Sequence, residues 1–271
     1  MQSRLLRAIA GLSLLAAPGG VAAQNAKDGF RWPEGKRAAV SLSFDDARPS
    51  QVDAGVPLLD KYGVKATFYV TPGNLEKRLS GWKKAAANAH EIGNHSSSHP
   101  CTVNYPFSSK NALENYTVSM MEEELDQASA EIQRLLGIKP LTFAYPCGQK
   151  FIGRGSAVKS YVPMVASRFI VGRGFRDEGA NDPAACDLAQ ALGMESDGLT
   201  FEQMRKAVED AAARGGWLVF AGHEIGKAGP QTTQAAVLEQ FLRYATDPAN
   251  GIWTDTVQAV GGYIRAQRGG D

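Results

Sequence analysis

Ala38-Ala39-Val40-Ser41-Leu42-Ser43-Phe44-Asp45-Asp46 is an apolar run that ends in two adjacent carboxylates. Its apolar side chains alternate with small or polar neighbours, which is the period of a β-strand. Further along the chain, His95-Ser96-Ser97-Ser98-His99 contains two of the four histidines. Two imidazoles and one carboxylate can hold a divalent cation, and the second carboxylate is then free to act as a base. The two segments therefore favour a metal-dependent hydrolase over a generic globular domain.

The spacing within each segment indicates how the side chains divide that work. His95 and His99 are four residues apart, so on one helical turn both rings would project from the same face. Asp45 and Asp46 are adjacent at a strand end, where successive side chains point to opposite sides, so one can bind the cation while the other accepts a proton. The alternatives are surface histidines in a serine-rich loop and aspartates that cap the next helix. His90 has apolar neighbours and is interpreted as a hydrogen-bonded core residue.

The first 23 residues are typical of an export signal. Arg4 and Arg7 precede an apolar core at 8–17, and small residues follow at 21–23. The core is too short to span a bilayer, so no membrane anchor is expected. The alternative is a retained amphipathic segment. We expect an exported protein, periplasmic or secreted, with a polar lead-in at residues 24–36.

The charge balance argues against a polyanionic partner. Removing residues 1–23 takes away two basic and no acidic side chains, which leaves 27 basic against 28 acidic residues and a net charge near −1. Such a chain has no electrostatic attraction to nucleic acid or to an anionic membrane. A neutral polymer is the better partner, and we expect a monomer.

Three cysteines allow one disulfide and one remaining thiol in an oxidising compartment. They are Cys101, Cys147 and Cys186. The spacing does not choose among the three pairings.

Predicted strands and helices alternate along the chain, which indicates parallel β-α units in one α/β domain. The predicted strands are 38–44, 64–70, 91–92, 141–145, 169–172 and 217–221. The predicted helices are 50–63, 79–90, 111–136, 201–214, 231–246 and 256–267. Each polar cluster of interest follows a predicted strand, and in a barrel of such units the carboxyl ends of the strands share one face. We therefore expect these clusters to converge.

The order of four motifs resembles that of the polysaccharide deacetylases, the NodB-homology group also called carbohydrate esterase family 4. These motifs are Ser43-Phe44-Asp45-Asp46, the segment 95–99, Phe143-Ala144-Tyr145-Pro146-Cys147-Gly148, and the apolar strand ending in Gly222-His223. The resemblance runs from about residue 37 to 260. It implies a distorted barrel of seven β/α units, a (β/α)7 NodB-like fold, with a catalytic domain over residues 37–271.

The resemblance also implies roles for single residues. Asp45 becomes the catalytic base and His223 the general acid, while Asp46, His95 and His99 become the ligands of a divalent metal. Zinc is the expected metal, with cobalt and nickel as alternatives. The backbone N–H of Cys147 falls where the family stabilises the oxyanion, and Tyr145 beside it is expected to face the substrate.

Two departures from the family pattern leave partners unassigned. Ala144 stands where the family often has an arginine paired with the catalytic aspartate, and Arg173 or Arg176 are the candidate replacements. The fourth motif, which carries an aspartate and a tryptophan, has no clear counterpart, so the group that orients His223 is not identified.

A Cys101–Cys147 disulfide would tie the metal loop to the oxyanion loop, with Cys186 as a competitor for either partner.

The function implied by the resemblance is hydrolysis of a carbon–nitrogen bond, the removal of N-acetyl groups from the amino sugars of an acetylated polysaccharide or oligosaccharide. Tyr105, Phe107 and Trp253 are candidates to line a sugar groove. The alternatives are an O-acetyl esterase on xylan-type glycans, a metal-free cyclic amidohydrolase of the same fold, and a carbohydrate-binding module without catalysis.

Overall fold

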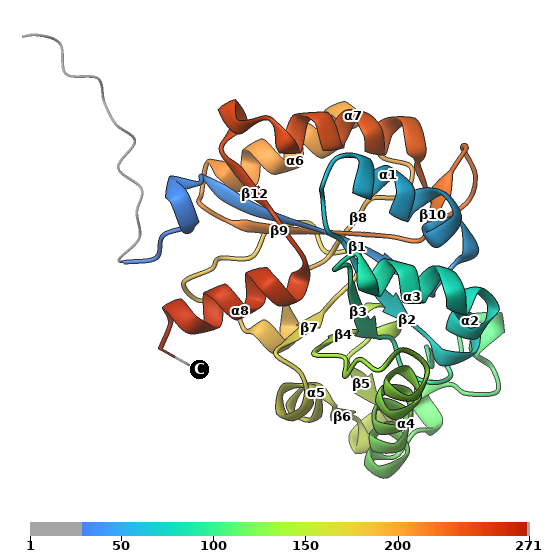
Figure 1. Cartoon of the computed structure of the whole chain (residues 1–271). Helices are drawn as coiled ribbons and strands as arrows, with labels where there is room; N and C mark the ends of the chain where they lie inside the picture. The colour runs from blue at the N-terminus through green and yellow to red at the C-terminus, as the bar shows by residue number, and fades with distance from the viewer. Residues whose placement is uncertain (1–28, 270–271) are drawn as a thin grey trace, which may run out of the picture.

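A curved parallel sheet of eight strands organises the fold (Figure 1). The computed structural model describes residues 29–269, so the predicted export signal lies outside the described residues. Seven strands lie in the order β7-β4-β3-β2-β1-β9-β8, and β12 pairs with β1. The strands are β1 Ala38–Asp45, β2 Thr67–Val70, β3 Glu91–Asn94, β4 Thr142–Ala144, β7 Val171–Arg173, β8 Met194–Glu195, β9 Trp217–Gly222 and β12 Ile252–Thr254.

Every pairing in this sheet is parallel. A single parallel bridge, between Arg173 and Ala191, links the end of β7 to the segment that leads into β8. The result is a half-barrel of parallel strands packed against helices, and this confirms the predicted α/β fold class.

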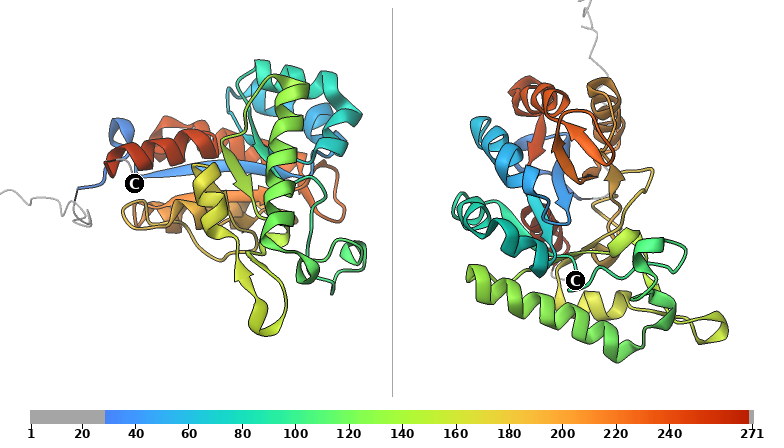
Figure 2. Two further views of the ribbon diagram at one scale, coloured as in Figure 1. Left: turned by 90° about the horizontal axis from the view of Figure 1, so that it is seen from below. Right: turned by 90° about the vertical axis from the view of Figure 1, so that its right-hand side faces the viewer.

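Within residues 29–269, eight α-helices pack around the sheet (Figures 1 and 2). They are α1 Val56–Lys61, α2 Pro72–Leu75, α3 Leu79–Ala87, α4 Val118–Leu136, α5 Val162–Arg168, α6 Phe201–Ala212, α7 Ala235–Thr246 and α8 Val257–Gln267. A π-helical turn, Gln51–Gly55, precedes α1. Two small pairs lie apart from the main sheet: β5 Phe151–Ile152 with β6 Lys159–Ser160, and β10 Glu224–Gly226 with β11 Thr232–Gln234.

Strand β1 lies in the interior of the sheet, between β2 and β9, and all eight of its residues are buried. Helices cover both faces of such a sheet, so burial does not alternate along the strand as the sequence pattern does. The predicted helix over 111–136 begins only at Val118, because Thr117 caps it by accepting a hydrogen bond from the Met120 N–H (3.2 Å). The predicted helix over 231–246 begins at Ala235, since residues 232–234 form β11.

The amino ends of β1 and β9 are closed by an aromatic cluster. Trp32 packs against Trp253 and Tyr263 at centroid distances of 5.9 and 6.1 Å, and its indole N–H donates to the Gly215 carbonyl (2.9 Å). Trp253 therefore lies at the end of the sheet opposite Asp45, and its proposed place in a sugar groove is wrong. Within residues 29–269, no helix has the length and apolar character needed to cross a membrane.

Candidate active site

The clusters predicted to converge do meet in one cleft, of about 770 Å³, at the carboxyl ends of the strands. Asp45 ends β1, while His95 follows β3 and His223 follows β9. The predicted residues that line the cleft are Asp45, Asp46, His95, His99, Cys147 and His223. His90 lies outside it, where it accepts a hydrogen bond from the Ala66 N–H (3.2 Å), so its interpretation as a core residue is confirmed.

Asp46, His95 and His99 face one another with their ligand atoms within 4.8 Å. Asp46 Oδ1 lies 3.6 Å from His95 Nε2 and 3.5 Å from His99 Nε2. His95 Nδ1 lies 2.8 Å from the Ala144 carbonyl, to which it donates, so the lone pair of Nε2 points at Asp46. Asp46 Oδ2 accepts a hydrogen bond from Arg48 (2.9 Å), which leaves Oδ1 as the oxygen offered to the two rings.

The charges of this group fit a divalent cation. Burial lowers the pKa of His95 to about 4, so its imidazole is neutral near pH 7 and can act as a ligand. Burial opposes ionisation of Asp46, but the neighbouring histidines outweigh burial and lower the pKa of that carboxyl to about 2. An ionised carboxylate with neutral imidazole nitrogens is a donor set that suits zinc and similar metals.

The segment that carries the two histidines is a loop, so the expectation of one helical turn is wrong. Its backbone reverses at Ser96 (φ 62°) and at His99 (φ 53°). Asn94 Oδ1 accepts from the Ser96 N–H (2.7 Å), and Ser96 Oγ accepts from the His99 N–H (3.0 Å). The Glu124 carboxylate accepts two more backbone N–H groups of the loop, at 2.9 and 2.8 Å. These local hydrogen bonds replace a helix and still bring both rings to Asp46.

Asp45 is buried beside the triad, and Arg173 is its ion-pair partner. Arg173 donates from Nη2 to Asp45 Oδ1 and lies with its guanidinium 4.9 Å from the centre of the Tyr69 ring. Burial raises the pKa of Asp45, but Arg173 and the nearby histidines outweigh it, so the net pKa lies below the ordinary value. Asp45 is therefore held ionised, as a base must be.

The register of β4 and β7 shows how Arg173 replaces the family arginine. Ala144 and Arg173 are direct partners across the parallel pair, so their side chains leave the same face of the sheet. The guanidinium thus comes from the neighbouring strand. The other candidate, Arg176, instead pairs with Glu195 (3.0 Å).

Asp197 is the partner of His223, and the sequence interpretation missed it. Asp197 Oδ2 accepts from His223 Nδ1 (2.6 Å), and Asp197 Oδ1 accepts from the Thr233 hydroxyl (3.0 Å). Burial lowers the pKa of His223, but the hydrogen bond with Asp197 and the charge of Asp45 outweigh it and raise the net pKa. Asp197 follows β8, a strand of two residues that is too short to give a periodic signal.

Gln51 joins the ends of the two strands that lead to Asp45 and His223. Its side-chain N–H groups donate to the backbone carbonyls of Asp45 (2.6 Å) and His223 (2.8 Å). The side chain is buried and comes from the π-helical turn after β1. π-Turns are frequent at functional sites, but no sequence pattern of this chain predicts one.

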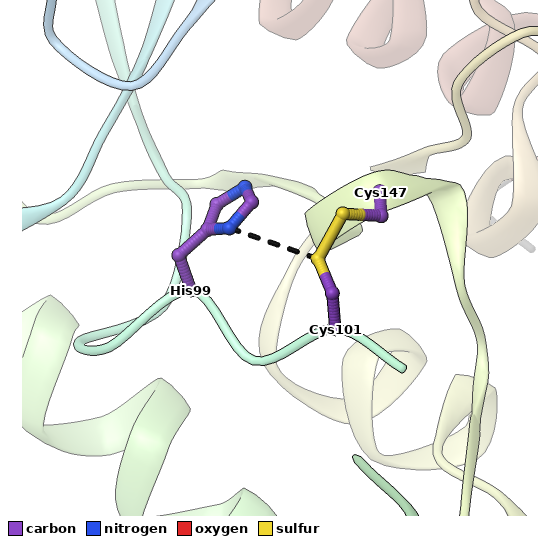
Figure 3. Close-up of side chains that lie close together, drawn as sticks. All are labelled: His99, Cys101 and Cys147. Carbon is purple, nitrogen blue, oxygen red and sulfur yellow. Dashed lines mark hydrogen bonds between the residues drawn. A yellow bond between two sulfur atoms is a disulfide. The ribbon is translucent and has the colours of Figure 1, made fainter. Parts of the chain in front are cut away.

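Cys101 and Cys147 form a disulfide (Figure 3). Of the three possible pairings, the structure contains the one that joins the histidine loop to the turn after β4. The disulfide ties the histidine loop to the turn at 146–148, where Cys147 has a φ of 54°.

The prediction that Tyr145 faces the substrate is wrong. Its ring is fully buried, and its hydroxyl donates to the Ala189 carbonyl (2.7 Å), because the strand turns that side chain into a core cluster behind the cleft.

The sequence and the structure of this chain are similar to those of known proteins. Residues 32–156 match the family model described as polysaccharide deacetylase. Over these residues, a little under half of its length, the chain resembles a polysaccharide deacetylase domain. The match spans the segments of Asp45, Asp46, His95, His99 and Cys147.

Two relatives share shorter stretches of sequence with this chain. YlxY of Bacillus subtilis is 34% identical over 93 residues, which are 34% of this chain and 26% of YlxY. A peptidoglycan-N-acetylglucosamine deacetylase of Bacillus cereus is 40% identical over 67 residues, 24% of each chain. The matched part therefore spans about a quarter of either relative.

Solved structures resemble this chain in fold over most of its length. A protein assigned as a polysaccharide deacetylase, from Mycobacterium smegmatis, superposes with a TM-score of 0.65 at 17% identity, over 89% of this chain and 94% of that one. An acetyl xylan esterase from Clostridium thermocellum, with a cobalt ion, gives 0.55 at 21%, over 83% and 91%. The allantoinase PuuE gives 0.62 at 13%, over 87% and 92%. At these identities the likeness establishes the fold alone.

Unusual backbone conformations concentrate in the cleft. Nine non-glycine residues among the described ones have a positive φ. Six of them line the cleft: Asp46, Ala47, His99, Cys147, Arg176 and Gln231. Such conformations cost about 1–3 kcal/mol each and persist where the surroundings enforce them, typically at functional sites.

Proposed function

We propose that this chain is a metal-dependent deacetylase that removes N-acetyl groups from amino sugars of an acetylated polysaccharide or oligosaccharide. The observation that carries the proposal is the joint placement, in one cleft, of a triad suited to a metal, an ionised carboxylate and a histidine held by a second carboxylate. A named deacetylase of N-acetylglucosamine in peptidoglycan shares part of this sequence, which supports an amide as the bond that is hydrolysed.

Asp46, His95 and His99 would hold the cation. Zinc is the first choice, with cobalt or nickel as alternatives, and the similar acetyl xylan esterase contains cobalt. A divalent cation bound there supplies Lewis-acid polarisation of the acetyl carbonyl. Arg48 binds the second oxygen of Asp46 and so fixes the orientation of that carboxylate.

The remaining residues move protons and stabilise charge. Asp45 takes a proton from the attacking water on Oδ2, because Oδ1 is bound to Arg173. The contact with Asp197 occupies Nδ1 of His223, so His223 donates a proton from Nε2 to the leaving nitrogen. The Cys147 N–H donates a hydrogen bond to the oxyanion that develops on the acetyl group.

The rim of the cleft favours a sugar chain as the substrate. Tyr105 and Phe107 line the cleft and stack with ring centres 5.5 Å apart and planes 6° from parallel. They are exposed, at 38% and 67%, in spite of their apolar rings. Exposed rings with parallel planes offer apolar faces against which the apolar face of a pyranose can pack. An exported enzyme, periplasmic or secreted, would meet such glycans outside the cytoplasm.

The test is acetate release from matched fragments of chitin, peptidoglycan and xylan. We expect release from the N-acetylated fragments, loss of that release after treatment with a chelator, and recovery on addition of zinc or cobalt. Release from xylan fragments alone would replace the amidase by an O-acetyl esterase. Activity that persists after the bound metal has been removed completely would contradict the role of the triad.

A further inference from the structure

His99 presents its two ring nitrogens to different partners. Nε2 lies 3.5 Å from Asp46 Oδ1, whereas Nδ1 lies 3.7 Å from the Cys101 sulfur (Figure 3). That sulfur is bonded to Cys147. The ligand atoms of His99, Cys101 and Cys147 all lie within 4.8 Å of one another. His99 therefore belongs to two groups of potential ligands, and the second contains the disulfide.

The oxidation state of the two sulfurs decides whether the second group can bind a metal. A disulfide sulfur is a poor ligand, whereas a thiolate is among the strongest for zinc and cobalt. A dithiol reductant transfers two electrons and two protons to the pair, so the S–S bond breaks, two thiols form and the dithiol leaves as a cyclic disulfide. A cation that then binds displaces the two thiol protons, and the proton on His99 Nδ1 moves to Nε2 or to solvent.

We propose that reduction of the Cys101–Cys147 disulfide creates a second metal site, formed by His99 Nδ1 and the two cysteine sulfurs, for a thiophilic divalent cation such as zinc or cobalt. The site goes beyond the proposed deacetylase function, because it concerns how many metal ions the chain holds. It is absent from the oxidised chain, where the sulfurs are bonded to each other.

Contacts other than the disulfide hold the loop that carries His99 and Cys101. The Cys101 N–H donates to Ser108 Oγ (2.8 Å), and the Ser108 hydroxyl donates to the Cys101 carbonyl (2.9 Å). The His99 N–H is bound to Ser96 Oγ (3.0 Å). Both His99 and Cys147 line the open cleft, so a small reductant and a cation can reach them. Reduction therefore frees the sulfurs without releasing the loop that carries His99 and Cys101.

The two sites share His99, so they are coupled. A cation held by the thiolates draws the His99 ring toward the sulfurs and weakens its contact with the ion at Asp46. The disulfide thus reserves His99 for the triad, and formation of the disulfide excludes a competing metal.

The test uses cobalt, because thiolate ligands give Co²⁺ a near-ultraviolet charge-transfer band that nitrogen and oxygen ligands do not give. Both samples are the Cys186→Ser variant, which lacks the one thiol outside the disulfide. One sample stays oxidised, and the other is reduced with a dithiol that is then removed under argon. We expect the charge-transfer band and one additional bound cobalt per chain in the reduced sample alone.

Two further variants of that chain keep the result decisive. Cys101→Ser with Cys147→Ser should lose the band after the same treatment. His99→Ala should weaken cobalt binding by the reduced thiols, whereas two cysteines in an unfolded chain would bind cobalt equally well with or without His99. A reduced sample without the band, equal cobalt content in both samples, or affinity unchanged by His99→Ala would each overturn the proposal. None of these readouts depends on acetate release, so the proposed deacetylase function is tested separately.

Discussion

Asp45 and Asp46 show how neighbours of one residue type acquire different chemistry. Asp45 ends a buried strand and is bound by Arg173, whereas Asp46 has a φ of 74° that turns its carboxylate toward two imidazoles. The sequence predicted the pair and its division of labour. It did not predict the turn, because a positive φ at aspartate leaves no pattern in neighbouring residues.

The first prediction separates the base from the metal ligands. Asp45→Asn should lower the rate of acetate release by roughly 10²–10⁴-fold, since a general base contributes about that much, and should leave bound zinc unchanged. His95→Ala should lose both the zinc and the activity. Metal content per chain and acetate release, measured on the same preparations, check the pair. Full activity of Asp45→Asn would end its assignment as the base.

The second prediction concerns the arginine that comes from the neighbouring strand. Arg173→Ala leaves Asp45 as a buried carboxylate without its cation, which should cost about 3–5 kcal/mol in unfolding free energy and most of the activity. Ala144 is the direct register partner of Arg173, so the double variant Arg173→Ala with Ala144→Arg restores a guanidinium on the same face. We expect it to recover part of both losses, as measured by urea unfolding and by kcat.

The control for that experiment is Ala144→Arg alone, in which two guanidinium groups compete for one buried position. It should be less stable than the double variant. If the double variant behaves no better than Arg173→Ala, the two positions are not interchangeable.

The third prediction concerns the pH dependence of the acid. The hydrogen bond with Asp197 raises the pKa of His223, so the imidazolium persists to a higher pH than it otherwise would. Asp197→Asn removes that charge, so the pKa of His223 falls and activity should be lost at a lower pH on the alkaline side. The pH profile of kcat/KM checks it. An unchanged alkaline limb, with only a uniformly lower rate, would assign Asp197 a purely structural role.

At the scale of elements, the sequence predicted the strands and helices that have a periodic pattern of apolar residues. Strands of four or more residues, followed by polar clusters, were visible as apolar runs, and their carboxyl ends do meet in one cleft. Asp197 and Gln51 were not predictable. One follows a two-residue strand and the other lies in a π-turn, and neither element is long enough to produce a period. The helical turn predicted for residues 95–99 was wrong, because hydrogen bonds to the Asn94 and Ser96 side chains take the place of helical ones.

The fourth prediction tests the aromatic rim as an element that binds sugars. Replacing Tyr105 and Phe107 by alanine should raise KM for chitin oligosaccharides about tenfold or more, since stacking on two rings contributes about 0.5–1.5 kcal/mol each. Hydrolysis of a small acetyl ester should be unchanged, because the reacting groups are untouched. Phe151→Ala is the matched control: it is a ring of similar exposure, at 59%, that does not line the cleft. An equal effect of the control would rule out a specific platform.

At the scale of the whole molecule, fold and substrate are separable. The same architecture is found in an acetyl xylan esterase and in an allantoinase, and both chains superpose over more than four-fifths of this one. The half-barrel therefore sets where chemistry occurs, at the carboxyl ends of the strands, while loops set what is bound. No feature of the sheet distinguishes one acetylated glycan from another.

The last prediction concerns the two ends of the sheet, because the cleft lies at the carboxyl ends of the strands and the aromatic cluster at the amino ends. Trp32 is 5% exposed, bonds to the Gly215 carbonyl and packs in the aromatic cluster at the amino ends of β1 and β9. Its replacement by alanine removes a large buried ring, which should lower the free energy of unfolding by about 3–5 kcal/mol. The cleft lies at the opposite ends of the strands, so kcat and KM should stay unchanged at temperatures where the variant is folded. Asp45→Asn should differ in kind, because its activity should be lost even at temperatures where that variant is folded. A loss of kcat in folded Trp32→Ala would show that the closed end of the sheet also controls the geometry of the cleft.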